Sequence, residues 1–117
     1  MEIAKGHQDP YQEGDGGRFT GRVWLSPGLS APGGTGMSVV HFSAGARTHW
    51  HTHPGGQLLY GVSGHGRVRS RGGQGHVLVP GDIVSIPPGD VFLILRPSSY
   101  PAATTAWPPT TGSPGLG

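Results

Sequence analysis

Residues 48–57 read Thr-His-Trp-His-Thr-His-Pro-Gly-Gly-Gln, and this stretch decides the fold. Its first six residues alternate with the period of a β-strand, in which side chains at i and i+2 point to the same face. His49, His51 and His53 are therefore expected to line one face. The Pro-Gly-Gly that follows breaks the strand, and Gln57 opens the next one.

The three histidines and the glutamine together predict a metal site. Same-face imidazoles about 7 Å apart at their Cα atoms can converge on one ion, and neutral imidazole is the commonest ligand for Zn, Fe, Mn and Ni. The alternative is a strand of exposed histidines that binds no metal. The amide oxygen of Gln57, placed just beyond the bend, favours the metal site.

Short apolar runs separated by turn residues continue on both sides of this stretch. The 23 glycines and 12 prolines fall mostly between these runs, and no segment has the 3.6-residue period of a helix. We therefore predict an all-β domain of eight or nine short strands. The main predicted strands are Phe19–Leu25, Met37–Ser43, Thr48–His53, Gln57–Val62, Arg67–Ser70, His76–Val79, Ile83–Ile86 and Val91–Leu95.

A chain of 117 residues has room for one domain with one core. We divide it into an N-terminal arm (1–18), a β-barrel domain (19–95) and an irregular tail rich in proline and glycine (96–117). The predicted strands at 57–62 and 83–86 are apolar on both faces, which is typical of strands buried between two sheets.

Composition excludes several classes of function. The formal charge is only +2, and no aromatic residues interleave with the alternating Arg67, Arg69 and Arg71, so these arginines favour a solvated strand face over a nucleic-acid site. The chain has no cysteine and therefore no disulfide or thiolate ligand. It lacks an apolar stretch of about 20 residues and a signal-like start. We expect a cytoplasmic protein with no membrane partner.

Two segments carry a resemblance to a known family. Gly45–Gln57, followed by Gly64, resembles the first motif of the cupins, and Pro80–Gly89 resembles the second. Met1–Ile3 and Phe19–Val23 look like the cupin branch that includes the manganese-dependent hydroxynitrile lyases. The resemblance implies a double-stranded β-helix, or jelly-roll barrel, over about three quarters of the chain.

The same resemblance implies the roles of the site residues. His51, His53 and Gln57 would bind one divalent metal ion (Mn, Fe, Zn or Ni, with Mn favoured by the resemblance). His49 lies one strand repeat earlier and is interpreted as a pocket group, the candidate for acid–base catalysis. The implied partner is a small-molecule ligand or substrate.

The chain departs from the family pattern after the second motif. A histidine that should follow Pro-Pro-Gly by three residues, and complete the metal site, is Phe92 here. A later histidine, the acid–base group of the lyases, corresponds to a position near Thr104, and no histidine follows His76. The proline-rich tail predicts a barrel that is incomplete at its C-terminal end. One hypothesis is that a frameshift replaced the native sequence after about Gly89.

Two imidazoles and an amide form a neutral ligand set, which leaves the full positive charge on the ion. This favours Lewis-acid chemistry, such as a lyase or isomerase acting on a small carbonyl-derived or cyanohydrin-like substrate. The alternatives are a non-catalytic module that binds a small molecule, and a truncated inactive family member. A homodimer is a further expectation, with an outward-facing Trp50 as one candidate anchor. A Trp50 that is covered by the N-terminal arm is the alternative.

Overall fold

The computed structural model describes residues 1–5, 8–98 and 115–116, and these residues form strands, turns and bends without a helix. The all-β prediction is confirmed. No helix that could cross a membrane is present in this part of the chain. The strands are β1 (Gln12–Glu13), β2 (Phe19–Thr20), β3 (Val23–Leu25), β4 (Leu29–Ser30), β5 (Gly36–Met37), β6 (Val40–Phe42), β7 (Arg47–Thr48), β8 (His51–Thr52), β9 (Gln57–Tyr60), β10 (Gly66–Ser70), β11 (Gly75–Leu78), β12 (Ile83–Ile86), β13 (Phe92–Leu95) and β14 (Gly115–Leu116).

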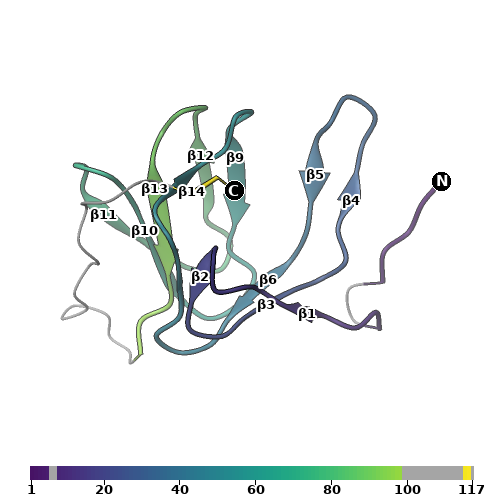
Figure 1. Ribbon diagram of the computed structural model, residues 1–117, viewed down its shortest axis with the longest axis horizontal. Helices are drawn as coiled ribbons and strands as arrows, with labels where there is room; N and C mark the ends of the chain where they lie inside the picture. Colours follow the sequence, from purple (N-terminus) through teal and green to yellow (C-terminus); the bar gives the residue numbers. More distant parts are fainter. Residues whose placement is uncertain (6–7, 99–114, 117) are drawn as a thin grey trace.

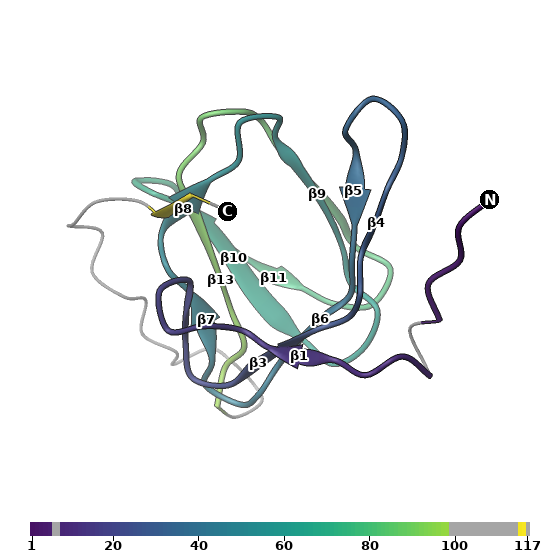
Figure 2. The ribbon, with the colours of Figure 1, turned by 45° about the vertical axis from the view of Figure 1, so that its right-hand side comes forward.

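The strands surround a common interior (Figures 1 and 2). The largest sheet runs β11-β10-β13-β7-β2, with β8 on β13 and β14 on β8, and separate sheets are formed by β12-β9, β1-β3-β6 and β4-β5. Val68 of β10, Phe92 of β13 and Ile86 of β12 form one buried cluster, with Leu59 of β9 packed against it. The β12-β9 sheet therefore packs face to face on the largest sheet.

The predicted strand Phe19–Leu25 is two strands that belong to different sheets. β2 pairs with β7, whereas β3 pairs with β1 and β6. Gly21 lies at the change of sheet with φ = 82°, and a Cβ there would lie 2.9 Å from the Cα of Ala46. Glycine permits both the left-handed backbone and this close approach, so the chain turns a barrel corner there.

The predicted strand Thr48–His53 is also interrupted. Arg47 pairs with Leu95, but His51 pairs with Phe92, so the register along β13 shifts by one residue between β7 and β8. One extra residue on one strand is the mark of a β-bulge. The expected uninterrupted alternation is therefore wrong, and side-chain direction on either side of the bulge no longer follows i, i+2 spacing.

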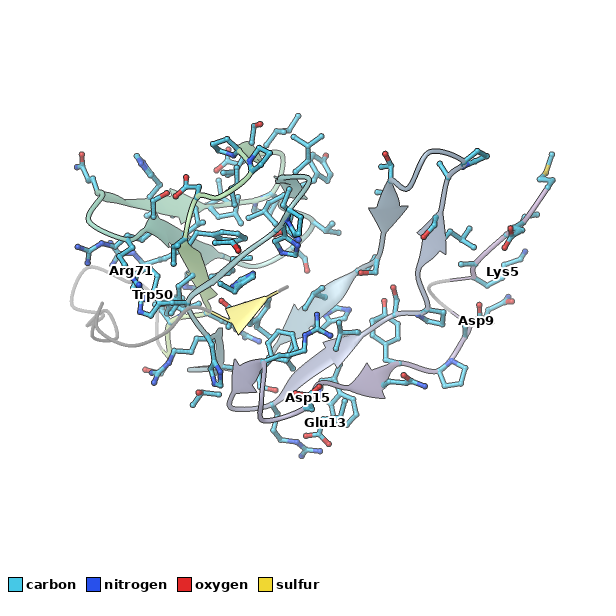
Figure 3. The ribbon with its side chains drawn as sticks, turned by 45° about the horizontal axis from the view of Figure 1, so that its top comes forward. Lys5, Asp9, Glu13, Asp15, Trp50 and Arg71 are labelled. Atoms are coloured by element: carbon cyan, nitrogen blue, oxygen red, sulfur yellow. The ribbon has the colours of Figure 1, made fainter. Side chains whose placement is uncertain are left out.

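Trp50 lies within the bulge and is buried, contrary to its expected outward position. It forms a cluster with Leu93 and Leu95. The guanidinium of Arg71 lies 5.6 Å from its ring centroid, and Figure 3 shows the two side chains together. Trp50 is consequently unavailable as an interface anchor.

The expected burial of β9 and β12 on both faces is wrong. Ile83 pairs with Tyr60 and Ser85 pairs with Leu58, so these residues share the outer face of the two-stranded sheet. Leu58, Tyr60 and Ile83 are all well exposed there, whereas Ile86 is buried on the inner face. No other strand of the described residues covers this outer face.

Strands lie in the predicted N-terminal arm and at the C-terminal end of the predicted barrel domain. β1 lies in the predicted arm and pairs with β3. β13 comes after Gly89 and pairs with β10, β7 and β8 within the largest sheet. The replacement of the sequence after about Gly89 stays a hypothesis. The tail segment 99–114, with Thr104, lies outside the described residues, and the division into arm, barrel and tail stays a prediction.

Candidate metal centre

His51 is held with one ring nitrogen available to a ligand. Its Nδ1 lies 2.7 Å from the backbone carbonyl oxygen of His49. A carbonyl can only accept a hydrogen bond, so Nδ1 carries the proton and donates, and Nε2 keeps its lone pair. A hydrogen bond of this kind fixes both the tautomer and the orientation of a metal-binding imidazole.

His53 lies beside His51. The two ring centroids are 5.1 Å apart and the rings are nearly perpendicular, at 75°. This arrangement brings both rings to one place, although β8 itself ends at Thr52. The structure thus brings together two of the three predicted ligands.

Both imidazoles favour the neutral form that a metal requires. Burial lowers the pKa of His51, and the neighbouring charges of His53 and Arg18 lower it further against the hydrogen bond to His49. Burial and the charge of Arg18 also lower the pKa of His53. Protons compete less well for these nitrogens than for those of a solvated histidine.

Gln57 supplies a buried oxygen that needs a partner. Its Oε1 is inaccessible to solvent and has no hydrogen-bond partner among the described residues. Gln57 opens β9 opposite Ile86, which lies in the core cluster with Phe92. An unpaired buried amide oxygen costs about 1–3 kcal/mol, and a bound cation would satisfy it.

Phe92 occupies the side of the centre where the family resemblance implies a histidine. Its fully buried ring has its centroid 4.3 Å from that of His51 and 5.8 Å from that of His53. It pairs with His51 across β8 and β13. The ring packs against both imidazoles and offers no lone pair, so this side of the centre is closed by an apolar wall.

The ring of His49 has a contact of its own on β2. Its Nε2 lies 3.2 Å from the hydroxyl of Thr20 on β2, and its backbone carbonyl accepts the hydrogen bond from His51. Within the described part of the chain, no three His, Cys, Asp or Glu side chains are grouped closely enough to hold a metal ion. The candidate centre is therefore limited to the two neighbouring imidazoles of His51 and His53, with the amide of Gln57 as the expected third donor.

Two neighbours of the centre were missed by sequence reasoning. Thr20 contacts His49 across 29 residues of sequence, and Arg18 acts electrostatically on His51 and His53. Neither residue belongs to a motif. The pairing of β2 with β7 brings them close to the histidines, and no local sequence pattern predicts that pairing.

By their chemistry, the three donors suit a divalent ion. His51 offers a free nitrogen, His53 lies beside it, and Gln57 has an oxygen without a partner. Histidine and amide ligands suit Mn, Fe, Zn or Ni. Because all three ligands are neutral, the ion would keep its full charge.

Comparisons with known proteins agree with this architecture. A family model described as "Cupin domain" matches residues 38–106. A protein from Granulicella tundricola named (R)-mandelonitrile lyase is 40% identical over 93 residues, which cover 77% of this chain and 70% of that protein. The crystal structure of a cupin-like protein from Thermotoga maritima superposes with a TM-score of 0.64 at 41% identity, covering 70% of this chain and 64% of the length of that one.

Proposed function

This chain belongs to the cupin family, and from that membership we propose that His51, His53 and Gln57 bind one divalent metal ion for lyase or isomerase chemistry on a small carbonyl-derived or cyanohydrin-like substrate. The observation that carries the proposal is the buried Oε1 of Gln57, which has no partner among the described residues. The relative named as a mandelonitrile lyase supports the reaction class. Manganese is favoured by the likeness to the lyase branch.

The chemistry follows from the neutral ligands. When bound, such an ion supplies Lewis-acid stabilisation of negative charge that develops on a substrate oxygen or on a departing cyanide. The chain would supply the surroundings: Phe92, Leu59 and Ile86 form an apolar wall, which favours a small substrate with an apolar or aromatic part.

His49 remains the proposed acid–base group. Its ring is neighboured by the hydroxyl of Thr20, which would orient it to hold or release a proton. A His49→Ala variant should retain its metal while losing turnover. Loss of metal as well would show that the side chain of His49 also supports the metal centre, because the backbone carbonyl that His51 contacts is unchanged in this variant.

Metal analysis of the purified protein tests the proposed centre. We expect about one ion per chain in the wild type and almost none in a His51→Ala, His53→Ala double variant. His41→Ala is the matched control, because His41 lies exposed on β6, where its ring contacts Tyr11. Equal, sub-stoichiometric metal in all three proteins would refute the centre.

Cyanide release from an aromatic cyanohydrin tests the chemistry separately. Metal-loaded protein should accelerate release, and a chelator should abolish the acceleration. If metal is bound stoichiometrically and cyanide release does not exceed the protein-free rate, the lyase assignment is wrong and the metal centre stands.

A non-catalytic module that binds a small molecule is the second candidate. The observation that favours it is Phe92, whose buried ring stands against both imidazoles where a fourth ligand is expected. Such a protein would bind an aromatic aldehyde in titration calorimetry without converting the corresponding cyanohydrin. Binding should then be weakened by Phe92→Ala.

A further inference from the structure

Arg18 lies next to the candidate metal centre and has no role assigned to it so far. Its backbone carbonyl accepts a hydrogen bond of 2.9 Å from the N–H of His49, which holds Arg18 beside the segment that leads into β8. Its side chain is exposed, but the central carbon of its guanidinium lies 5.5 Å from the ring centroid of Phe19. Phe19 is buried in a core cluster. The guanidinium is therefore turned toward the core of the barrel.

The charge of Arg18 reaches both histidines that are proposed to bind the ion. Burial is the main cause that lowers the pKa of His51 and of His53, and the charge of Arg18 lowers both further. The other charged groups that act on these two rings are histidines, and no carboxylate is among them. With neutral ligands and a divalent ion, the surroundings of the centre would therefore carry only positive charge, which attracts an anion.

No carboxylate in the described part of the chain forms an ion pair with Arg18. Asp15 is close in sequence, but its side chain accepts a hydrogen bond of 2.9 Å from the N–H of Gly17. Glu13 is paired with Arg22 at 3.1 Å. A planar guanidinium matches the two oxygens of a carboxylate, so Arg18 can bind a carboxylate that comes from outside the chain.

We propose that Arg18 binds a carboxylate of the substrate, and that the substrate of this centre is a small carboxylic acid with an apolar or aromatic part. This role of Arg18 rests on the proposed function, because it names the class of carbonyl-derived substrate on which the metal would act. Phe92, Leu59 and Ile86 form the apolar wall that would contact the rest of the molecule. The positive charge favours such an acid over a neutral cyanohydrin. Arg18 is thus a specificity-determining residue.

Titration calorimetry of the full, metal-loaded chain with mandelate, a small aromatic hydroxy acid, tests this role. Arg18→Gln should weaken mandelate binding about 10-fold or more, because charge-assisted hydrogen bonds are lost, and Arg18→Lys should weaken it less. Mandelamide, which has a similar shape without the charge, should bind the wild type and Arg18→Gln equally. Arg22→Gln is the matched control, because it removes the same charge from an exposed arginine that is paired with Glu13. It should bind mandelate as the wild type does.

Metal analysis of the same proteins distinguishes a failure of this role from a failure of the metal centre. Arg18→Gln should keep the metal content of the wild type, since Arg18 is not a ligand. A wild type that binds no mandelate overturns the role of Arg18, as does equal binding by Arg18→Gln or an equal loss in Arg22→Gln, and none of these results touches the metal centre. Mandelate binding that depends on Arg18 in a protein without stoichiometric metal would support the carboxylate site and contradict the proposed centre.

Discussion

At the scale of single residues, neighbouring groups set the tautomer and the pKa of the histidines that are proposed to bind the ion. The carbonyl of His49 holds the proton of His51 on Nδ1, burial lowers the pKa of both imidazoles, and the buried Oε1 of Gln57 has no hydrogen-bond partner among the described residues. Phe92 lies beside both imidazoles but has no lone pair with which to bind an ion. Each of these effects can be changed by one substitution.

Replacing Phe92 with histidine should strengthen metal binding. The new imidazole would stand beside His51 and His53, whose ring centroids are 4.3 and 5.8 Å from that of Phe92, and a further ligand should raise the affinity at least 10-fold, since even an indirect partner contributes about 10–100-fold. Competition with a chelator measures the change. Phe92→Leu is the control and should show no gain; an equal affinity for the wild type and Phe92→His would contradict the proposed position of the ion.

The stability of the metal-free protein should depend on pH through the two imidazoles. Their pKa values are lowered by burial from the ordinary 6.5, so the unfolded chain takes up protons that the folded protein does not. Stability should therefore be complete above pH 6.5 and fall as the pH drops below it toward the folded pKa values. Thermal unfolding between pH 8 and pH 5 measures this. A His51→Gln, His53→Gln variant with an equally steep fall would contradict the assignment.

At the scale of elements, the turn between His53 and Gln57 fixes the backbone where β9 begins. Gly56 has φ = 76°, and a Cβ there would lie 2.8 Å from the carbonyl oxygen of Ile86 and 3.2 Å from the Cδ of Pro88. No other residue fits this approach without moving the start of β9. Gly56 is therefore expected to position Gln57 at the start of β9, although Gly56 itself offers no ligand atom.

Gly56→Ala should therefore reduce metal affinity as well as stability. Gly81→Ala is the matched control, because Gly81 has φ = 93° and open space around its would-be Cβ. Both variants should lose about 1–2 kcal/mol of stability from the left-handed backbone, and Gly56→Ala should lose more. Denaturant unfolding and chelator competition separate the effects. If both variants retain metal equally, Gly56 does not position Gln57.

Elements also show how far sequence reasoning reaches. The period-2 pattern and the turn residues correctly predicted β9 to β13 to within one or two residues, because glycine and proline punctuate those strands. The bulge between Thr48 and His51 left no mark in the residue pattern. Its register depends on β13, more than 40 residues away, and His49 was consequently placed with the other two histidines.

The sequence also could not predict that the outer face of β9 and β12 is exposed to solvent. Leu58, Tyr60 and Ile83 are as apolar as core residues, and a pattern of apolar residues on both faces cannot distinguish a second sheet from a second molecule. The family and the three candidate ligands came from a motif of contiguous residues. The positions of Thr20 and Arg18 near the histidines were identified only from the structure.

At the scale of the whole molecule, the expected homodimer can be tested through the exposed, uncharged outer face of β9 and β12, which carries Leu58, Tyr60 and Ile83. Exposed charges are screened by salt, whereas apolar burial is not weakened by it. A homodimer formed through this face should therefore dissociate no more readily in about 0.5 M NaCl than at low salt. Sedimentation equilibrium at both salt concentrations measures this. A dimer that weakens more than 10-fold in high salt would point to an interface built on charged side chains.

The convergence of His51, His53 and Gln57 on one ion is tested most directly by crystals of the full chain grown with manganese. Anomalous scattering at the manganese edge locates the ion without assumptions about activity. We predict one peak per chain, within coordination distance of Nε2 of His51, a ring nitrogen of His53 and Oε1 of Gln57. A crystal with no peak there, or with the ion bound at other side chains, would contradict the proposed centre.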